Sequence, residues 1–278
     1  MANASIYSLL ELARAWDIKL NTAQQVMQHV LGVSLVELRL EANKALSLAE
    51  SEQIKDIFRQ LSQGKPLGYI INTQHFWDFE LYVSCDVLLP RFDTERLVEH
   101  AINLINNCSA STQPFKILDL CTGSGAIAIA LAKECKNVHI DAVDICPKAL
   151  LVAQKNLDLN HISNVNLIQS DLFEKINLNY DFIITNPPYI AANSLEVSPE
   201  VIAYEPHIAL FSAENGFWHI KQIIQQADKY LNNAGYLLIE HGFNQQAGVL
   251  KLFSQYGFNK IQTAKDYCGH DRLSWAQK

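Results

Sequence analysis

The sequence predicts an α/β protein with a mostly parallel sheet, preceded by a small N-terminal helical bundle domain. From about Arg91 onward, short apolar runs typical of buried strands alternate with helical segments, which favours a parallel sheet covered by helices on both faces. A glycine-rich loop stands between one of these strands and the next helix, and two consecutive prolines follow a later strand. At 278 residues the chain is long enough for two domains and a sizeable core.

Residues 5–63 show the periodicity of a helical bundle. Apolar side chains recur at helical spacing in three stretches, and such stripes are typical of helix faces that pack together. The stripes are Leu9, Leu10, Ala13 and Trp16; Val26, Met27, Val30 and Leu31; and Ile54, Ile57, Phe58 and Leu61. We therefore predict a helical domain at 1–63, a β-hairpin linker at 64–90 and the α/β domain at 91–278.

The glycine-rich loop is the first candidate binding feature. The segment 115–120 is typical of a strand, the loop Cys-Thr-Gly-Ser-Gly at 121–125 follows at once, and 126–132 predicts a tightly packed helix. Glycine lets the backbone approach a ligand closely, and a helix N-terminus presents unpaired N–H groups. The order of strand, glycine loop and helix is typical of a nucleotide-binding site.

Carboxylates follow the next two predicted strands. The strand 138–143 ends on Asp144, whose carboxylate can accept both hydroxyls of a ribose. Ser170 and Asp171 follow the strand 165–169, where an adenine amino group would need an acceptor. These positions indicate a nucleoside lying along the carboxyl ends of the strands.

The most informative segment is Asn186-Pro187-Pro188-Tyr189, which follows the apolar run 181–185. Two prolines cannot continue a central strand, so the backbone leaves the sheet at the edge where open α/β sheets bind ligands. The side-chain oxygen of the asparagine and the carbonyl of the first proline are two acceptors that can hold an –NH2 group. The tyrosine ring can pack on a flat amide or base. The segment therefore indicates a site for a planar nitrogen nucleophile, with a simple proline-rich turn as the structural alternative.

The glycine loop by itself also fits another class of enzyme. Gly123, Gly125 and Ala128 match the pattern G-x-G-x-x-A, and Asp144 lies about 20 residues further on, as a dinucleotide site requires. A nicotinamide-dependent oxidoreductase is therefore a competitor on the loop alone. The Asn-Pro-Pro-Tyr segment argues against it, because hydride transfer has no evident use for two acceptors that hold an amide.

Taken together, these motifs resemble class I S-adenosylmethionine-dependent methyltransferases of the Asn-Pro-Pro-Tyr type, and more narrowly the peptide chain release factor N5-glutamine methyltransferases. Further matching segments are 64–70, 75–84, 88–95, 238–242 and 266–272. The segment 88–95, Leu-Leu-Pro-Arg-Phe-Asp-Thr-Glu, does most to separate this family from adenine methylases, which share Asn-Pro-Pro-Tyr. The first sixty or so residues match in helical character only.

The resemblance implies a Rossmann-like sheet with an antiparallel C-terminal hairpin, with strands near 235–240, 257–263 and 271–276. It also implies S-adenosyl-L-methionine as cofactor, S-adenosyl-L-homocysteine as product, and the glutamine of a release factor Gly-Gly-Gln motif as the methylated residue. It assigns catalysis to Asn186, Pro187 and Tyr189, and substrate binding to these residues and Pro188. Because the substrate is a large protein and residues 1–63 carry no cofactor motif, the resemblance also makes 1–63 the expected substrate-recognition domain. The implied cofactor-binding residues are Asp119, Cys121, Thr122, Gly123, Ser124, Gly125, Asp144, Asp171, Leu172 and Asn186, and no metal is expected.

Three residues depart from the family pattern. Phe92 stands where the family usually has proline, so the loop before Asp93 is expected to be less stiff. Cys121 replaces the usual first glycine of the cofactor loop, and its Cβ predicts either an ordinary negative φ or a strained loop. Leu172 stands where some relatives carry tryptophan beside the adenine. None of these changes removes a group that the chemistry needs.

Two other substrates stay open as alternatives. A methyltransferase acting on a glutamine of ribosomal protein L3 shares Asn-Pro-Pro-Tyr, although the segment 91–95 looks less like that family. A nucleic-acid adenine N6-methyltransferase is less favoured, because the net charge is −7 and the sequence contains no run of basic residues that could neutralise phosphates.

The remaining expectations concern surroundings and partners. The six cysteines show no C-x-x-C spacing, and no apolar run or signal pattern predicts a membrane span or export, so free thiols and a cytoplasmic location are expected. The expected partners are release factors, without direct nucleic-acid or membrane contact, and the expected state is a monomer.

Overall fold

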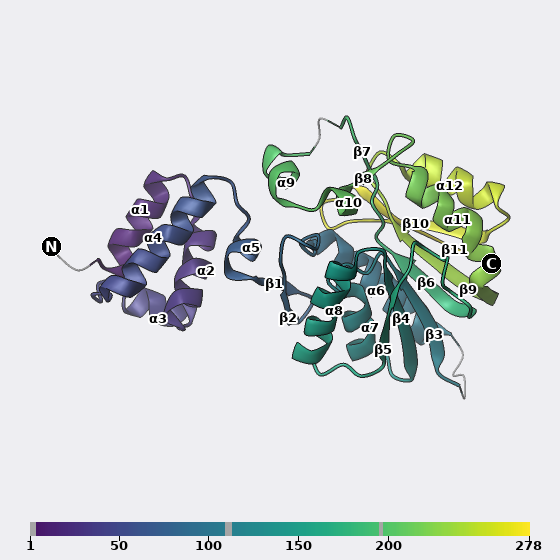
Figure 1. Ribbon diagram of the computed structural model, residues 1–278, viewed down its shortest axis with the longest axis horizontal. Helices are drawn as coiled ribbons and strands as arrows, with labels where there is room; N and C mark the ends of the chain where they lie inside the picture. The colour runs from purple at the N-terminus through teal and green to yellow at the C-terminus, as the bar shows by residue number, and fades with distance from the viewer. Residues whose placement is uncertain (1–3, 109–112, 195–196) are drawn as a thin grey trace. The chain divides into compact units, whose positions relative to one another are not determined.

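The computed structural model describes residues 4–108, 113–194 and 197–278, which form two compact units, Met1–Asn72 and Thr73–Lys278 (Figure 1). Figure 1 draws the first unit in purple and blue. Each unit has its own hydrophobic core, and each is described separately below.

The first unit is a bundle of helices. They are α1 (Ile6–Ala15), α2 (Leu20–Leu31), α3 (Leu35–Leu40), α4 (Leu48–Ser62) and α5 (Leu67–Ile71). The serines that precede α1, α3 and α4 each form a capping box, which satisfies N–H groups that the helix itself leaves unpaired. The predicted stripes make the core: Leu9, Val26, Met27 and Phe58 are fully buried, whereas Trp16 is 37% exposed. Residues 67–71, predicted as part of the hairpin linker, form α5 instead, because Pro66 supplies a favourable helix start.

The second unit opens with the predicted hairpin, β1 (Thr73–Phe76) paired antiparallel with β2 (Phe79–Tyr82). Asn156, on helix α8 (Pro147–Leu159), holds this hairpin to the sheet domain. Its buried side chain accepts a hydrogen bond from the Tyr82 N–H at 2.7 Å and donates to the Tyr82 carbonyl at 2.9 Å. It also donates to the carbonyl of Ser124 in the glycine loop at 2.9 Å. One side chain therefore joins hairpin, helix and loop.

A seven-stranded sheet forms the body of the second unit, in the order β10-β11-β9-β6-β3-β4-β5. Its strands are β3 (Phe115–Leu120), β4 (Val138–Asp144), β5 (Val165–Gln169), β6 (Tyr180–Thr185), β9 (Leu231–Glu240), β10 (Asn259–Lys265) and β11 (Asp271–Gln277). The first five run parallel, while β11 pairs antiparallel with both β9 and β10. The predicted Rossmann-like sheet with an antiparallel C-terminal hairpin is confirmed.

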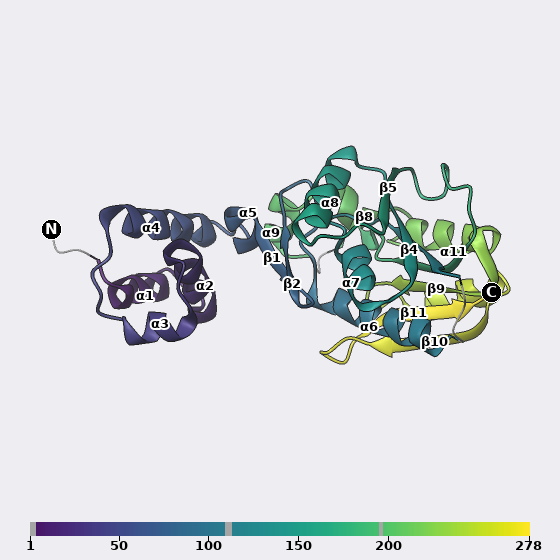
Figure 2. The same ribbon diagram turned by 90° about the horizontal axis from the view of Figure 1, so that it is seen from below.

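Helices cover both faces of this sheet (Figure 1 and Figure 2). On one face lie α6 (Phe92–Asn107), α7 (Ala126–Glu134) and α8, and on the other α11 (Trp218–Tyr230) and α12 (Gln246–Gln255). The short elements α9 (Pro199–Tyr204), α10 (His207–Leu210) and the paired β7 (Ile190–Ala191) and β8 (Phe211–Ser212) follow the Asn-Pro-Pro-Tyr segment. None of the helices in the described ranges has the length and apolar character that a membrane span requires.

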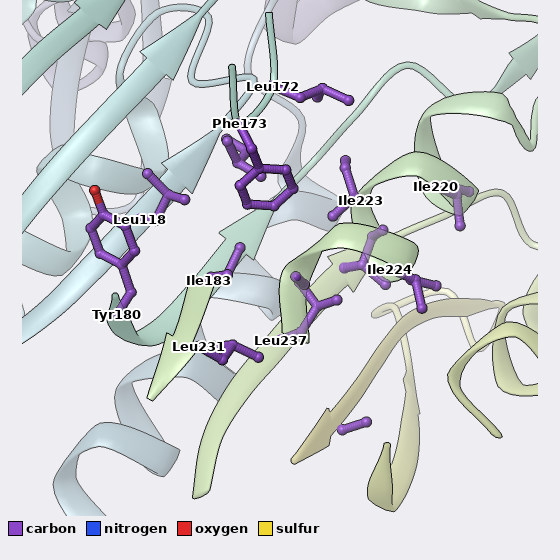
Figure 3. Close-up of a cluster of buried hydrophobic side chains, with 14 of the residues drawn as sticks. Leu118, Leu172, Phe173, Tyr180, Ile183, Ile220, Ile223, Ile224, Leu231 and Leu237 are labelled. Atoms are coloured by element: carbon purple, nitrogen blue, oxygen red, sulfur yellow. The ribbon is translucent and has the colours of Figure 1, made fainter. Parts of the chain in front are cut away.

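The core between the sheet and α11 fixes the central strands. Figure 3 draws Ile220, Ile223 and Ile224 of α11 in one buried cluster with Ile183 of β6 and Leu237 of β9. All five side chains are fully buried. Because the central strands are parallel, their carboxyl ends meet at one edge of the sheet, and the loops that carry the predicted site residues gather there.

We expect Asn156→Ala to lower the free energy of unfolding by about 2 kcal/mol, since three buried backbone groups would lose their partner. Urea unfolding followed by circular dichroism measures the change. Gln154→Ala on the exposed face of the same helix is the control and should alter stability by no more than about 0.5 kcal/mol. Equal effects of the two substitutions would show that the Asn156 bonds do not hold the hairpin.

Candidate active site

A cavity of about 250 Å³ lies at the carboxyl ends of the central strands. Six residues predicted to bind the cofactor line it together: Cys121, Gly123, Asp144, Asp171, Leu172 and Asn186. They come from the carboxyl end of β4 and from the loops after β3, β5 and β6, which the parallel order brings to one edge of the sheet. The fold therefore brings these six residues, which are far apart in the sequence, to one cavity.

The glycine loop turns sharply out of β3. Cys121, Gly123 and Gly125 have φ angles of +60°, +55° and +83°. Of the two alternatives expected for Cys121, an ordinary negative φ or a strained loop, the structure shows the second. A side chain with a Cβ is strained in this region, so Cys121 costs the loop some stability.

Gly123 is open toward the cavity. A Cβ added at this position would meet no heavy atom within 4 Å, so a larger side chain would project into the cavity space. Its N–H donates to Asp144 Oδ2 at 2.9 Å. The bare backbone beside a fixed carboxylate suits the ribose and amino acid parts of S-adenosyl-L-methionine.

Four other predicted cofactor residues belong to the end of β3 and the glycine loop and are not among the residues that line the cavity. They are Asp119, Thr122, Ser124 and Gly125, all of them buried. The Thr122 hydroxyl donates to Asp119 Oδ2 at 2.6 Å, and burial raises the pKa of this carboxyl to about 7. Their assignment to the cofactor site stays a prediction, and in this geometry they fix the shape of the loop.

Asp144 is the carboxylate that faces the cavity from β4. The backbone N–H of Cys146 donates to its Oδ1 at 2.9 Å, while Gly123 holds the other oxygen. Burial raises the pKa of Asp144, although these two N–H donors stabilise the charged form. The carboxylate is therefore held in one orientation at the cavity lining, and each oxygen can accept a further hydrogen bond.

Asn186 stands between this cavity and a second one of about 210 Å³. The second cavity is lined by Arg91, Pro187 and Tyr189 among others, and Leu88, Asn186 and Ala209 line both. The Asn186 Nδ2 donates to the Thr94 hydroxyl oxygen at 3.1 Å. A residue that borders two adjoining cavities can bring a group in one against a group in the other.

Tyr189 is held by a buried carboxyl group at the end of β9. Its hydroxyl lies 3.2 Å from Glu240 Oε1, and burial raises the pKa of Tyr189, so the hydroxyl stays protonated and donates. Burial also raises the pKa of Glu240 to about 7, while the Thr94 hydroxyl, Arg272 and the Tyr189 hydroxyl favour the ionised form. Gln245 Nε2 donates to the Tyr189 carbonyl at 3.0 Å, so backbone and ring are both fixed.

His241, directly after Glu240, is occupied by structural contacts. Its Nδ1 lies 3.0 Å from the Gly242 carbonyl and its Nε2 2.8 Å from the Ser274 hydroxyl. Burial lowers the pKa of His241, so the ring is neutral at ordinary pH. It is a poor candidate for a proton acceptor in the reaction.

A third cavity of about 280 Å³ adjoins the second and is lined by Phe243, Asn244 and Arg272. Tyr189 and Ile190 line both. The three cavities therefore follow one another past the Asn-Pro-Pro-Tyr segment. This succession leaves room for a loop of chain beside the tyrosine as well as for a single side chain.

Several cavity residues were missed in the sequence. Ile145 follows Asp144 directly and was within reach of sequence reasoning. Trp218 and His219 begin α11, and their ring centroids lie 4.7 Å apart in an edge-to-face contact. The His219 Nδ1 lies 2.7 Å from the Ser212 hydroxyl. No local pattern marks these two rings, because only the packing of α11 against the sheet brings them to the cavity.

No cluster of three or more potential metal ligands occurs among His, Cys, Asp and Glu in residues 4–108, 113–194 and 197–278. Cys121 and Cys146 line the first cavity as free thiols. Burial raises the pKa of the Cys121 thiol, which disfavours the thiolate that nucleophilic catalysis requires.

Two family models match the chain. Residues 9–71 match the PrmC N-terminal domain, and residues 95–207 match the methyltransferase small domain. The release factor glutamine methyltransferase of Francisella tularensis subsp. tularensis is 40% identical, over all of this chain and 99% of the relative. That of Aliivibrio fischeri is 37% identical, over 92% of this chain and 89% of the relative.

Solved structures support the fold. The catalytic domain of hMettl16 in complex with MAT2A 3'UTR hairpin 6 superposes with a TM-score of 0.56 at 16% identity, over 71% of this chain and 74% of that one. A methyltransferase from Pyrococcus furiosus gives a TM-score of 0.53 at 13% identity, over 82% of this chain and 97% of that one.

The sheet order, the glycine loop and the cavity at the carboxyl ends define a class I methyltransferase, an enzyme class whose cofactor is S-adenosyl-L-methionine. Within that class, the full-length matches settle the family. The chain belongs to the release factor glutamine methyltransferases.

We expect Asp144→Ala to weaken the binding of S-adenosyl-L-homocysteine by about 1–3 kcal/mol, because ligand hydroxyls would lose a buried acceptor. Isothermal titration calorimetry measures the affinity. Asp158→Ala, on the exposed face of α8, is a matched control that should leave it unchanged. Undiminished affinity in a folded Asp144→Ala protein would remove Asp144 from the cofactor site.

Proposed function

We propose that this protein transfers the methyl group of S-adenosyl-L-methionine to the side-chain nitrogen N5 of the glutamine in the Gly-Gly-Gln motif of peptide chain release factors. The position of Asn186 between two adjoining cavities is the observation that carries the proposal. One cavity suits the cofactor, and the other suits a side chain that ends in an amide. The family to which the chain belongs supports glutamine as that side chain.

The first cavity would hold the cofactor, which supplies a methyl group made electrophilic by the sulfonium charge. Asp144 would accept the ribose hydroxyls, and the open backbone at Gly123 would admit the ligand closely. Asp171 and Leu172 would take the adenine from the loop after β5. These roles follow from residues that line a common cavity.

The second cavity would hold the glutamine amide. An amide nitrogen is a poor nucleophile because its lone pair is delocalised into the carbonyl. The side-chain oxygen of Asn186 and the carbonyl of Pro187 would accept its two N–H groups and fix its orientation, with Pro188 stiffening the turn. Both acceptors direct negative dipoles at a nitrogen that becomes positive in the transition state. Tyr189 would pack on the amide plane.

The proton need not be removed before methyl transfer. The nitrogen becomes acidic once it carries the extra methyl group, so water can take its proton afterwards. The pairing of His241 with Gly242 and Ser274 agrees with this, since that ring is committed elsewhere. The work of the chain is therefore alignment and electrostatic stabilisation.

The shape of the site favours a flexible loop as substrate. Glycines before the glutamine would let the loop enter the 210 Å³ cavity without side-chain clashes, and the adjoining third cavity could take the chain that follows. No observation favours ribosomal protein L3 or a nucleic-acid adenine over a release factor. We propose further that the enzyme acts as a monomer and that the helical unit recognises the body of the release factor.

We expect Asn186→Ala to slow single-turnover methylation by about 10²–10³, the loss typical for one preorganised polar group. Binding of S-adenosyl-L-homocysteine should persist, because the glycine loop and Asp144 stay intact. Asn193→Ala in the exposed stretch after β7 is the control. A near-normal rate for Asn186→Ala would refute the amide-holding role.

The substrate itself provides a direct test. A release factor incubated with enzyme and cofactor should gain the mass of one methylene group on its Gly-Gly-Gln peptide. A release factor with Gln replaced by Glu should gain none, since a carboxylate has no N–H to donate. Methylation of DNA or of ribosomal protein L3 in preference to release factor would overturn the proposal.

Removal of the helical unit tests its role. A truncated protein that begins at Thr73 should still bind S-adenosyl-L-homocysteine, because the whole cavity belongs to the second unit. It should methylate intact release factor poorly while a short Gly-Gly-Gln peptide reacts as it does with the full chain. Full activity of the truncated protein on the intact factor would assign the helical unit another role.

A further inference from the structure

The segment 88–95 distinguishes the family, yet the reaction described above gives no role to its middle residues. Arg91 forms an ion pair with Glu205 at 2.5 Å, and thereby braces the wall of the second cavity. Thr94 makes a different contact, to a residue that touches the substrate. Its hydroxyl oxygen accepts a hydrogen bond from Asn186 Nδ2 at 3.1 Å, across 92 positions of sequence.

We propose that Thr94 is a positioning residue, whose hydroxyl fixes the orientation of the Asn186 side-chain amide so that Oδ1 meets the substrate glutamine. This deepens the proposed function and rests on it, because the glutamine amide is taken as the group that Asn186 holds.

An asparagine amide needs such a contact because its two ends are nearly equal in shape and opposite in hydrogen bonding. Turned by half a rotation, Asn186 would present its –NH2 group to the –NH2 group of the substrate, donor against donor. The Thr94 hydroxyl accepts from Nδ2 and so favours one of the two orientations. Thr94 is buried at 5% exposure in the first turn of α6, where little water competes for this bond.

A hydroxyl can also donate, so the direction of the Thr94–Asn186 bond must itself be set. Glu240 is the group that favours one direction. It is fully buried, and the Thr94 hydroxyl is among the groups that stabilise its ionised form. A carboxylate is acceptor only, so a Thr94 proton directed toward Glu240 leaves the hydroxyl lone pair free for the Asn186 Nδ2–H, in agreement with the observed bond.

The same carboxylate accepts the Tyr189 hydroxyl at 3.2 Å. Glu240 therefore orients both ends of the Asn-Pro-Pro-Tyr segment, Tyr189 directly and Asn186 through Thr94. Burial raises the pKa of Glu240 to about 7, so the carboxyl group is mostly ionised at pH 8. An ionised Glu240 can only accept, so the Tyr189 and Thr94 hydroxyls would then both act as donors toward it.

The test compares Thr94→Val, which keeps the shape and loses the hydroxyl, with Thr94→Ser, which keeps the hydroxyl and loses the methyl group. At pH 8 we expect Thr94→Val to slow single-turnover methylation of release factor about 10- to 100-fold, since small misplacements at a reacting centre have effects of this size. Thr94→Ser should stay within about threefold of the unchanged enzyme. Thr94→Ala serves as a second hydroxyl-free variant in case valine disturbs the fold.

The affinity for S-adenosyl-L-homocysteine should stay within about twofold in all three variants, because Thr94 lies outside the lining of the first cavity. If Thr94 had only a structural role, Thr94→Val would lower the melting temperature of the protein and its affinity for S-adenosyl-L-homocysteine together. Equal loss of rate in Thr94→Ser and Thr94→Val would assign the effect to packing of the methyl group and overturn the proposal, as would an unchanged rate in Thr94→Val.

A second measurement does not depend on turnover. The side-chain NH2 resonances of Asn186 can be assigned in ¹⁵N-edited spectra of the full chain by their disappearance in Asn186→Asp. Thr94→Val and Thr94→Ala should shift them, and Thr94→Ser should leave them near their original positions. Unshifted resonances in both hydroxyl-free variants would overturn the proposal. If the unchanged enzyme failed to methylate release factor, the proposed function would be wrong. The shifts of the Asn186 resonances would still show whether Thr94 forms the hydrogen bond to Asn186.

Discussion

The two prolines at the end of β6 impose the constraint on which the site depends. A proline has no N–H and cannot continue a central strand, so the chain must leave the sheet after Thr185. Because β6 lies in the middle of the parallel sheet, this exit places Asn186 at the shared edge where the other loops converge. The cofactor cavity, the second cavity and the contact with Thr94 all follow from that position.

The polar groups around this exit are buried and mutually dependent. Burial of Glu240 is unfavourable for its charge, which is why its pKa rises to about 7. Hydroxyl donors from Thr94 and Tyr189 offset part of this cost, and Arg272 contributes a positive charge nearby. The hydrogen bond from Tyr189 to Glu240 Oε1 and that from Asn186 to Thr94 restrict the side chains to one geometry, although Glu240 Oε2 is buried without a hydrogen-bond partner. Rigidity is what a reaction governed by alignment needs.

The glycine loop shows where a local rule fails. Cys121 has a Cβ, and the sequence alone favours a negative φ, yet the structure places it at +60°. The loop must turn so that the N–H of Thr122 bonds to the Val143 carbonyl at 2.9 Å and that of Gly123 bonds to Asp144. These two bonds join neighbouring strands and outweigh the preference of a single residue.

The sequence by itself determined the strands and helices of the α/β unit, the glycine loop, the position of Asp144 at the end of a strand and the exit of the chain at Asn-Pro-Pro-Tyr. Each of these features depends on a pattern of residues that are close together in the sequence. It also determined the helical bundle, although α5 was taken for part of the linker. Only the tertiary structure decided which predicted residues line the cavity and which, like Asp119, do not. It alone joined Thr94 to Asn186 and brought Trp218 to the cavity, since contacts between distant segments depend on the order and packing of the strands and helices.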